Sequence, residues 1–444
     1  MTGSNFLLDT GSEKILIDCG LAQGTAEALA QNQAAFVYDP ASVDYLVVTH
    51  AHLDHIGRIP KLVRDGFKGT IYSTEATRAL AEPLLQDELA LMTHEHYNHA
   101  HHPDHPKDPL YTEVDIAHAF RLWKTVFYHQ PLQLGGVKLE LLNSGHILGS
   151  SMAKFSREGK SIVFTGDLGG GNSPLLSHCE EPTGINYLVM ESVYGDRTRK
   201  DSDRRERLEN VIEDAAARGG TLLIPAFSTE RTQDLLFEIR NLMVEKRVPQ
   251  SSVYVDSPLA EKITESYLAY PAYFAPALRT RVEAGEKIFT FPGMHFVGSQ
   301  EESRGLHEKP DPKIILAGSG MGQGGRVIAH EEVLLPDPKT TLLIVGYQAA
   351  GTIGRRLTEG ASELELYGKK VPVRARIEQI YGYSAHMDGE QLVEFVNGIG
   401  QPLSQVFAVM GEPLASSTLV QRIRDYLGVK AIAPEAGESA MIEL

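Results

Sequence analysis

Four side chains that commonly bind metal ions or transfer protons crowd into six residues of this chain. They are His50, His52, Asp54 and His55, and they directly follow the apolar run YLVV. In an extended segment residues two apart point the same way, so His50 and His52 could bind one cation together. A helix that starts after Leu53 would turn Asp54 and His55 toward a second position nearby. Imidazole nitrogens with carboxylate oxygens suit zinc or another first-row divalent ion.

Such a motif needs further ligands, and the chain offers them after other apolar runs. His146 stands in LNSGHILGS, Asp167 in VFTGDLG and Asp18 in LIDCG. A single histidine or aspartate after a strand is most often a cap or turn residue. Several of them at successive strand ends indicate one site, in which Asp18 could orient a ligating histidine by a hydrogen bond.

These side chains must be positioned by strands, which short apolar runs predict. Several runs end in polar or glycine-rich turns, and layered α/β folds gather their functional groups at the carboxyl ends of strands. The first half alternates predicted helices with strands at Asn5–Leu8, Ile15–Asp18, Tyr45–Thr49, Thr70–Ser73, Val137–Leu142, Ser161–Thr165 and Tyr187–Met190. A second series of strands and helices begins near Asp196 and predicts a parallel sheet of its own.

The composition excludes several classes of protein. The 444 residues, 42% of them hydrophobic, are enough for two or three domains. No apolar run reaches the length of about 18 residues that a membrane span needs, and no signal peptide is visible. Two cysteines, Cys19 and Cys179, fit a reducing compartment, so we expect a cytoplasmic protein. The net charge of −16 argues against non-specific binding of nucleic acid.

Two segments suggest ligand sites only superficially. Residues 94–105 hold six of the 17 histidines, but composition alone fixes no coordination geometry, so a polar surface loop is the simpler interpretation. The segment GMGQGG, residues 320–325, fits the GxGxxG pattern of dinucleotide-binding folds. No acidic residue follows about 20 residues later, as that fold requires, so we expect no nucleotide cofactor.

The motifs together resemble a known fold and one branch of it. HxHxDH, then a distant histidine in a glycine-flanked turn, then TGD resembles the metallo-β-lactamase fold. Later motifs resemble its β-CASP branch of nucleases, namely MESVYGDR, PAFSTERTQDLL, VDSPLA, LAGSGMGQGGR, GTIGRRL and YSAHMD. The resemblance covers essentially the whole chain. It implies an α/β protein, a metallo-β-lactamase αββα sandwich with an inserted β-CASP α/β domain. Residues 1–195 and 366–444 would form the core, and residues 196–365 the cassette.

The resemblance also implies the roles of single residues. One zinc ion would be held by His50, His52, His146 and Asp167, and a second by Asp54, His55 and Asp167. Glu191 in MESVYG matches the first signature acid of the branch. His386 in YSAHMD matches its signature histidine and would be the general acid, steered by Glu191. The candidate phosphate contacts in the cassette motifs are Ser228, Arg231, Ser319 and Arg326.

The chain departs from the family pattern at two places. RNA-cleaving members have a histidine where AVMGEP has Met410, and a thioether is a weak ligand for zinc, so the second ion would be held less tightly. DNA-processing relatives also lack that histidine. Family members usually have a strand before TGSN, whereas this chain starts at Met1. The sheet edge that this leaves could pair with another chain, so a homodimer is an option.

We therefore expect a zinc-dependent phosphodiesterase that hydrolyses single-stranded RNA, as an exonuclease or an endonuclease. Metal-activated hydroxide would attack, and His386 would protonate the leaving oxygen. Three alternatives stay open. The same ligands serve small-molecule hydrolases of lactams or thioesters, because a fold does not determine a function. A DNA nuclease and an inactive scaffold that binds RNA are the others, and only Met410 favours the scaffold.

Overall fold

The computed structural model describes residues 3–22, 26–99, 109–198, 203–322, 324–346, 348 and 351–444. The second half of the histidine-rich segment, residues 100–105, and Gln323 of the glycine-rich segment lie outside these residues. The chain forms two compact units. The first comprises Met1–Gly171, Ser177–Thr198 and His386–Leu444, and the second Asn172–Leu176 and Arg199–Ala385. The domain limits that the sequence suggests, after residues 195 and 365, stay a prediction.

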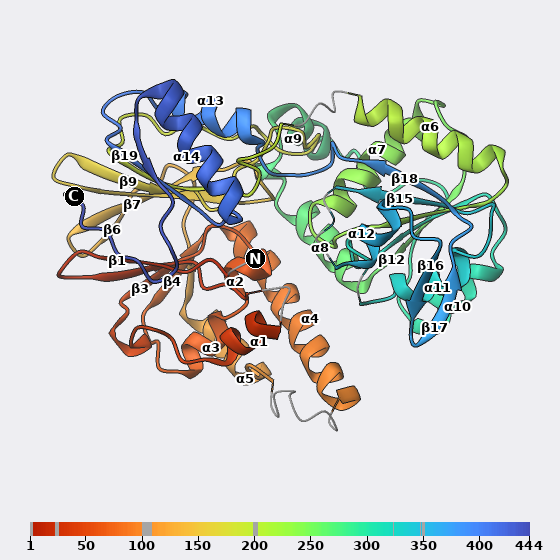
Figure 1. The fold of residues 1–444 in the computed structure, drawn as a ribbon, viewed down its shortest axis with the longest axis horizontal. Helices are drawn as coiled ribbons and strands as arrows, with labels where there is room; N and C mark the ends of the chain where they lie inside the picture. Colours follow the sequence, from red (N-terminus) through yellow and green to blue (C-terminus); the bar gives the residue numbers. More distant parts are fainter. Residues whose placement is uncertain are drawn as a thin grey trace. The chain divides into compact units, whose positions relative to one another are not determined.

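Two sheets form the centre of the first unit (Figure 1). One has the strand order β1 (Phe6–Asp9), β2 (Lys14–Ile17), β3 (Tyr45–Val47), β4 (Thr70–Ser73), β5 (Trp123–Thr125). The other has the order β20 (Lys430–Ile432), β19 (Gln405–Val409), β10 (Tyr187–Glu191), β9 (Lys160–Phe164), β8 (Ser151–Arg157), β7 (Val137–Asn143), β6 (Leu132–Leu134). Apolar side chains of both sheets fill the space between them, with Ile17 and Val47 on one side and Leu139, Phe155 and Phe164 on the other.

Helices cover the outer faces of the two sheets. Helices α13 (Gly389–Ile399) and α14 (Pro413–Leu427) bury Leu392, Phe395 and Ile423 against the seven-stranded sheet. Next to the five-stranded sheet lie α3 (Ile59–Arg64), α4 (Glu75–His99) and α5 (Glu113–Leu122). This αββα sandwich confirms the predicted core fold. Among the described residues, no helix is both long and apolar enough to cross a membrane.

One part of the first unit differs from the sequence prediction. The sequence predicts strands that alternate with helices, but β5 to β9 follow one another with no helix between them in residues 123–164. Strand β8 pairs antiparallel with both β7 and β9. Antiparallel neighbours need only a tight turn, and Glu158 and Gly159 supply one with φ angles of 50° and 85°.

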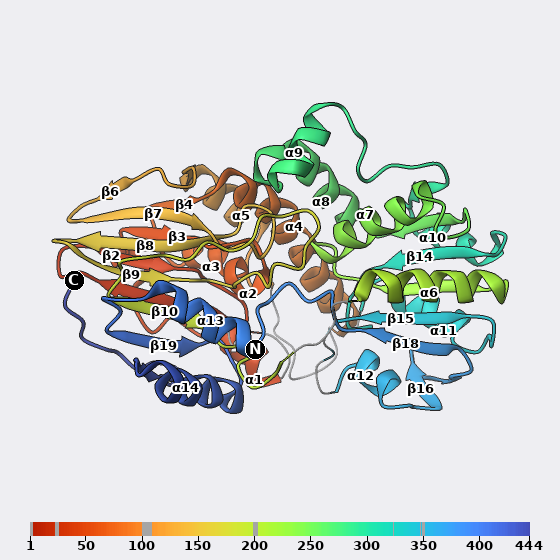
Figure 2. The ribbon, with the colours of Figure 1, turned by 90° about the horizontal axis from the view of Figure 1, so that it is seen from above.

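The second unit is built on a parallel sheet, as the sequence predicts (Figure 2). Its strand order is β13 (Met294–Phe296), β12 (Ser252–Asp256), β14 (Lys313–Ala317), β11 (Thr221–Pro225), β15 (Thr341–Val345), β18 (Arg376–Ile380), and all neighbours are parallel. The helices of this unit include α6 (Arg204–Ala217), α7 (Arg231–Val244), α8 (Pro258–Ala269) and α11 (Val327–Leu334). The strands β11, β14 and β15 are buried along their whole length, which is typical of a parallel sheet covered on both faces.

Backbone hydrogen bonds hold the short helix α2 (Leu53–Ile56), which carries Asp54 and His55. The amide of Ser4 donates to the carbonyl of Asp54 at 2.7 Å, and the amide of Cys19 to that of His55 at 2.8 Å. Gly20 lies against the same turn so closely that a Cβ atom there would stand 1.6 Å from the Asp54 carbonyl oxygen. Only glycine allows this approach of two backbone segments.

We expect Gly20→Ala to destabilise the first unit and to displace α2. The new methyl group meets backbone atoms that cannot rotate away, and such overpacking costs about 1–3 kcal/mol or more in the free energy of unfolding. Thermal unfolding followed by circular dichroism measures it. Gly305→Ala is the matched control, because a Cβ atom there meets nothing within 4 Å. Equal melting temperatures for the two variants would contradict the prediction.

Candidate metal centre

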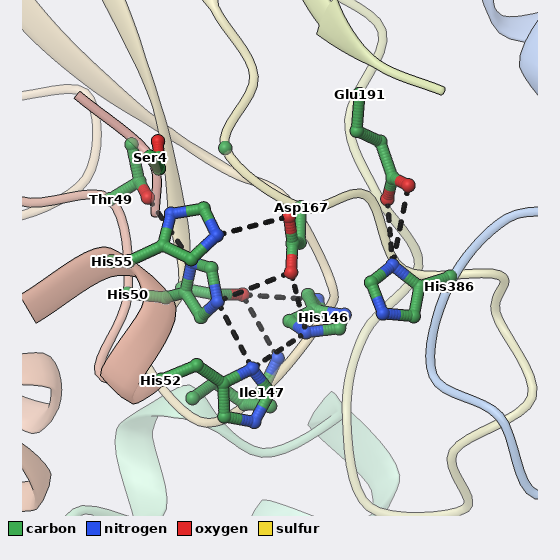
Figure 3. Close-up of polar contacts among 12 residues, drawn as sticks. Ser4, Thr49, His50, His52, His55, His146, Ile147, Asp167, Glu191 and His386 are labelled. Carbon is green, nitrogen blue, oxygen red and sulfur yellow. Dashed lines mark hydrogen bonds and ion pairs between the residues drawn. The ribbon is translucent and has the colours of Figure 1, made fainter. Parts of the chain in front are cut away.

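The predicted ligands of the first metal ion lie at strand ends of both sheets (Figure 3). His50 and His52 follow β3 of the five-stranded sheet, and His52 is the N-cap residue of α2. His146 lies in the turn between β7 and β8, and Asp167 follows β9. The structure thus places these four residues at the carboxyl ends of strands, where the sequence predicts them.

The four side chains form one compact group of donor atoms. His52 Nδ1 lies 3.1 Å from His50 Nε2 and 3.2 Å from His146 Nε2. Asp167 Oδ2 lies 3.4 Å from both of these Nε2 atoms. A tetrahedral zinc site with ligands at about 2.0–2.1 Å has ligand–ligand distances of about 3.3–3.4 Å. The group therefore fits a single divalent metal ion.

The protonation of the group also suits a metal ion. Burial lowers the pKa of His52 below its usual value and holds the pKa of His50 and His146 well below theirs. The three imidazoles are therefore neutral at pH 7 and can offer lone pairs. Burial opposes ionisation of Asp167, but the neighbouring His55 and His50 outweigh it and hold its pKa well below the usual range. The donor set is thus three neutral nitrogens and one carboxylate.

Asp18 forms hydrogen bonds with two residues next to this group, Thr49 and His55. Its carboxylate accepts hydrogen bonds from the amide and the hydroxyl of Thr49 at 2.8 and 2.9 Å, and from His55 Nδ1 at 2.7 Å. Since the Thr49 hydroxyl donates to Asp18, it accepts from His50 Nδ1 at 3.1 Å. The Nε2 atoms of both histidines are thereby left for the site. The orienting role that the sequence predicts for Asp18 stays a prediction, and the part of Thr49 in these contacts has no clear signal in the sequence.

His55 lies on the other side of Asp167, where the sequence predicts a second ion. His55 Nε2 and Asp167 Oδ1 face each other at 3.3 Å, and within the described residues neither makes a hydrogen bond. Burial opposes protonation of His55, but the carboxylates of Asp167 and Asp18 outweigh it and raise its pKa well above the usual value. Asp54 is partly exposed on α2. Asp54, His55 and Asp167 do not come as close together as the first group does, in the part of the chain that the structure describes.

His386 and Glu191 contact each other and lie beside the group of candidate metal ligands described above. His386 Nδ1 is 3.0 and 3.3 Å from the two carboxylate oxygens of Glu191, and the Leu168 amide donates to the same carboxylate at 2.7 Å. Glu191 is fully buried at the end of β10, whereas the His386 side chain is 22% exposed. Ligand atoms of Asp167, Glu191 and His386 all lie within 4.8 Å of one another. A histidine–glutamate pair thus stands next to the group of His50, His52, His146 and Asp167.

Met410 follows β19 with a φ angle of 65° and is partly exposed. Its side chain is partly buried at this strand end. The expectation that it weakens a second metal site stays a prediction.

The predicted phosphate contacts all belong to the second unit. Ser228 contacts the Ser257 hydroxyl at 3.1 Å, and Ser319 is partly exposed after β14. Arg231 is buried and donates to the Val345 carbonyl at 2.8 Å.

Arg326 also forms its hydrogen bonds with groups of its own unit. Its guanidinium binds the Asp256 carboxylate at 2.5 Å and the carbonyls of Val297 and Gly298 at 2.8 and 3.0 Å. Asp256, which the sequence analysis does not single out, also accepts from His330 at 2.6 Å. Both arginines therefore serve the packing of the second unit in this structure.

Comparison with known proteins identifies three families along the chain. Residues 2–250 match the metallo-beta-lactamase superfamily, and residues 232–357 match the Beta-Casp domain. Residues 370–434 match the Zn-dependent metallo-hydrolase RNA specificity domain. A protein of unknown function from Enterococcus faecalis has the same fold, with a TM-score of 0.55 at 13% identity over 98% of this chain and 96% of that one.

Several curated proteins are similar over most of their length. Ribonuclease TTHA0252 of Thermus thermophilus is 34% identical over 90% of this chain and 88% of its own. An RNase J-like protein of Methanocaldococcus jannaschii is 31% identical over 97% and 94%, respectively. Transcription termination factor FttA of Methanosarcina mazei is 30% identical over 97% of this chain and 68% of its own. The chain therefore belongs to the metallo-beta-lactamase superfamily, in its β-CASP branch.

Proposed function

We propose that this chain is a zinc-dependent ribonuclease that hydrolyses phosphodiester bonds in single-stranded RNA. The observation that carries the proposal is the buried group of His50, His52, His146 and Asp167, which is spaced for a metal ion and adjoins a histidine–glutamate pair. The match to an RNA specificity domain and the ribonuclease names of two relatives support RNA as the substrate.

Two zinc ions per chain are part of the proposal. His50, His52, His146 and Asp167 would hold the first, and Asp54, His55 and Asp167 the second. Imidazole and carboxylate ligands support zinc. His55 Nε2 and Asp167 Oδ1 face each other at 3.3 Å without a hydrogen-bond partner among the described residues, which supports a second ion that would replace the proton of His55. Bound divalent ions lower the pKa of a water ligand and neutralise charge on the phosphodiester oxygens.

His386 protonates the ribose oxygen that leaves. Its Nδ1 is engaged by Glu191, so Nε2 is the nitrogen that can face the substrate. A carboxylate beside an imidazole favours the charged imidazolium, which is the form that can donate a proton. The Glu191 side chain is itself held in place, because it is buried and accepts a hydrogen bond from the Leu168 amide. The pair therefore keeps an oriented acid beside Asp167.

Ser228 and Ser319, which are partly exposed at strand ends, remain candidates for phosphate binding. Arg231 and Arg326 could bind phosphate only if they exchanged their present partners.

A homodimer would use β1, which is the edge strand of its sheet. The free thiols of Cys19 and Cys179 support a cytoplasmic enzyme.

We expect the purified protein to bind two zinc ions, and His55→Ala to bind one. The variant removes a ligand of the second ion only, whereas His52→Ala removes a ligand of the first. Inductively coupled plasma mass spectrometry of protein dialysed against buffered zinc measures the ratio. A full complement of zinc in His55→Ala would rule out its role as a ligand.

Asp18→Asn should weaken zinc binding without removing a ligand. An amide cannot accept all the hydrogen bonds that orient His50 and His55, and losses of such supporting contacts typically cost about 10–100-fold in metal affinity. Competition with a fluorescent zinc chelator gives the dissociation constant. An unchanged constant would mean that Asp18 does not set the orientation of the ligands.

His386→Ala should reduce RNA cleavage by about 10²–10⁴-fold, the usual contribution of a general acid, and leave the zinc content unchanged. The assay follows 5′-end-labelled single-stranded RNA on a sizing gel. Mononucleotides that appear first indicate an exonuclease that starts at the 5′ end, and internal fragments indicate an endonuclease. Zinc-loaded protein that cleaves DNA, lactams or thioesters but no RNA would overturn the proposal.

A further inference from the structure

The imidazole of His146 lacks a hydrogen bond that two neighbouring imidazoles have. His50 Nδ1 lies 3.1 Å from the Thr49 hydroxyl, and His55 Nδ1 lies 2.7 Å from the Asp18 carboxylate. His146 directs Nε2 toward the other donor atoms (Figure 3), but its Nδ1 is buried and has no hydrogen-bond partner within the part of the chain that the structure describes. A contact at the second nitrogen usually fixes the ring of a metal-binding histidine. The orientation of His146 therefore depends on the backbone that carries it.

The hydroxyl group of Ser150 binds that backbone directly. Its Oγ atom accepts hydrogen bonds from the amide of His146 at 3.0 Å and from the amide of Ile147 at 3.1 Å. The Ser144 hydroxyl donates to the same oxygen at 2.9 Å. Ser150 is completely buried, so solvent does not compete for these bonds. One oxygen atom thus ties together both ends of the turn that carries the histidine.

Further hydroxyl groups hold the end of the turn next to Ser150. Thr74 and Thr77 donate to the Gly149 carbonyl at 2.7 and 3.0 Å. Tyr128 donates to the Ser150 carbonyl at 2.7 Å. These contacts fix residues 149 and 150, and the Ser150 hydroxyl connects them to His146.

We propose that Ser150 is a positioning residue for His146 in the candidate site of the first metal ion. Its hydroxyl sets the orientation of the His146 peptide group, and this peptide group sets where Nε2 points. Without the hydroxyl, two buried amides lose their acceptor, which is unfavourable until the turn rearranges. Ligands must be held within about 0.5 Å of the productive geometry, so such a rearrangement weakens metal binding. The inference rests on the proposed zinc site.

The first test compares the zinc affinities of full-length proteins by competition with a fluorescent chelator. We expect Ser150→Ala to raise the dissociation constant of the more tightly bound zinc ion about 10–100-fold, the usual cost of losing a supporting contact. Ser161→Ala is the matched control and should leave the constant unchanged. It also removes a buried serine hydroxyl, but near the start of β9, whereas Asp167 follows the end of that strand. Melting curves without zinc establish that both variants are folded.

Two further variants separate the hydroxyl of Ser150 from the volume of its side chain. Threonine and valine have nearly the same shape, but only threonine keeps an oxygen that can accept the two amide hydrogen bonds. Ser150→Thr should therefore bind zinc at least about tenfold more tightly than Ser150→Val. Equal constants for this pair would overturn the inference, and the comparison also serves if Ser150→Ala does not fold.

A double-mutant cycle tests whether Ser150 acts through His146. In the His146→Ala background the ligand is gone, so adding Ser150→Ala should change the dissociation constant by less than about twofold. A further loss as large as in the wild-type background would mean that Ser150 supports the fold in general, and would overturn the inference. An unchanged constant in folded Ser150→Ala would do the same and leave the zinc site standing. Wild-type protein that binds no zinc overturns the proposed function, and the inference falls with it.

Discussion

The carboxylate of Asp167 is the group on which the candidate centre depends. Oδ2 faces the Nε2 atoms of His50 and His146, and Oδ1 faces that of His55. A buried carboxylate is costly unless a positive charge compensates it. The raised pKa of His55 lets it compensate the Oδ1 side, whereas burial keeps His50 and His146 neutral on the Oδ2 side. A bound cation on that side would add positive charge next to the carboxylate and accept the lone pairs of the histidines. Metal binding and the stability of this region are therefore linked.

Both sheets of the first unit contribute residues to this candidate centre. The five-stranded sheet provides His50 and His52, and the seven-stranded sheet provides His146, Asp167 and Glu191. Because the sheets pack face to face through a common apolar core, the ends of their strands are held at fixed positions. The core thus keeps the ligands in place before any ion binds, so that little reorganisation opposes metal binding.

The second unit uses most of its buried charges for its own structure. Arg326 and His330 both bind Asp256, and Arg204 binds Glu238. A buried charge without a partner is strongly destabilising, so such residues are constrained whether or not they also meet a substrate. This is why basic residues in cassette motifs cannot be read directly as phosphate contacts. Ser319, which follows β14, is by contrast partly exposed.

The sequence by itself determined the family, the parallel sheet of the second unit and which residues gather around His50. These follow from short patterns whose spacing acts locally, such as two histidines on one side of an extended segment. Strand β8 escaped the sequence analysis, because an antiparallel strand joined to its neighbour by a tight turn needs no helix and leaves little local signal. The pairing of His386 with Glu191, 195 positions away, was expected from the family resemblance alone, and the tertiary structure gave its geometry. It also decided that Arg231 and Arg326 bind protein groups and that Tyr383 binds Glu238. Burial and partners arise from packing between distant segments, which no local pattern encodes.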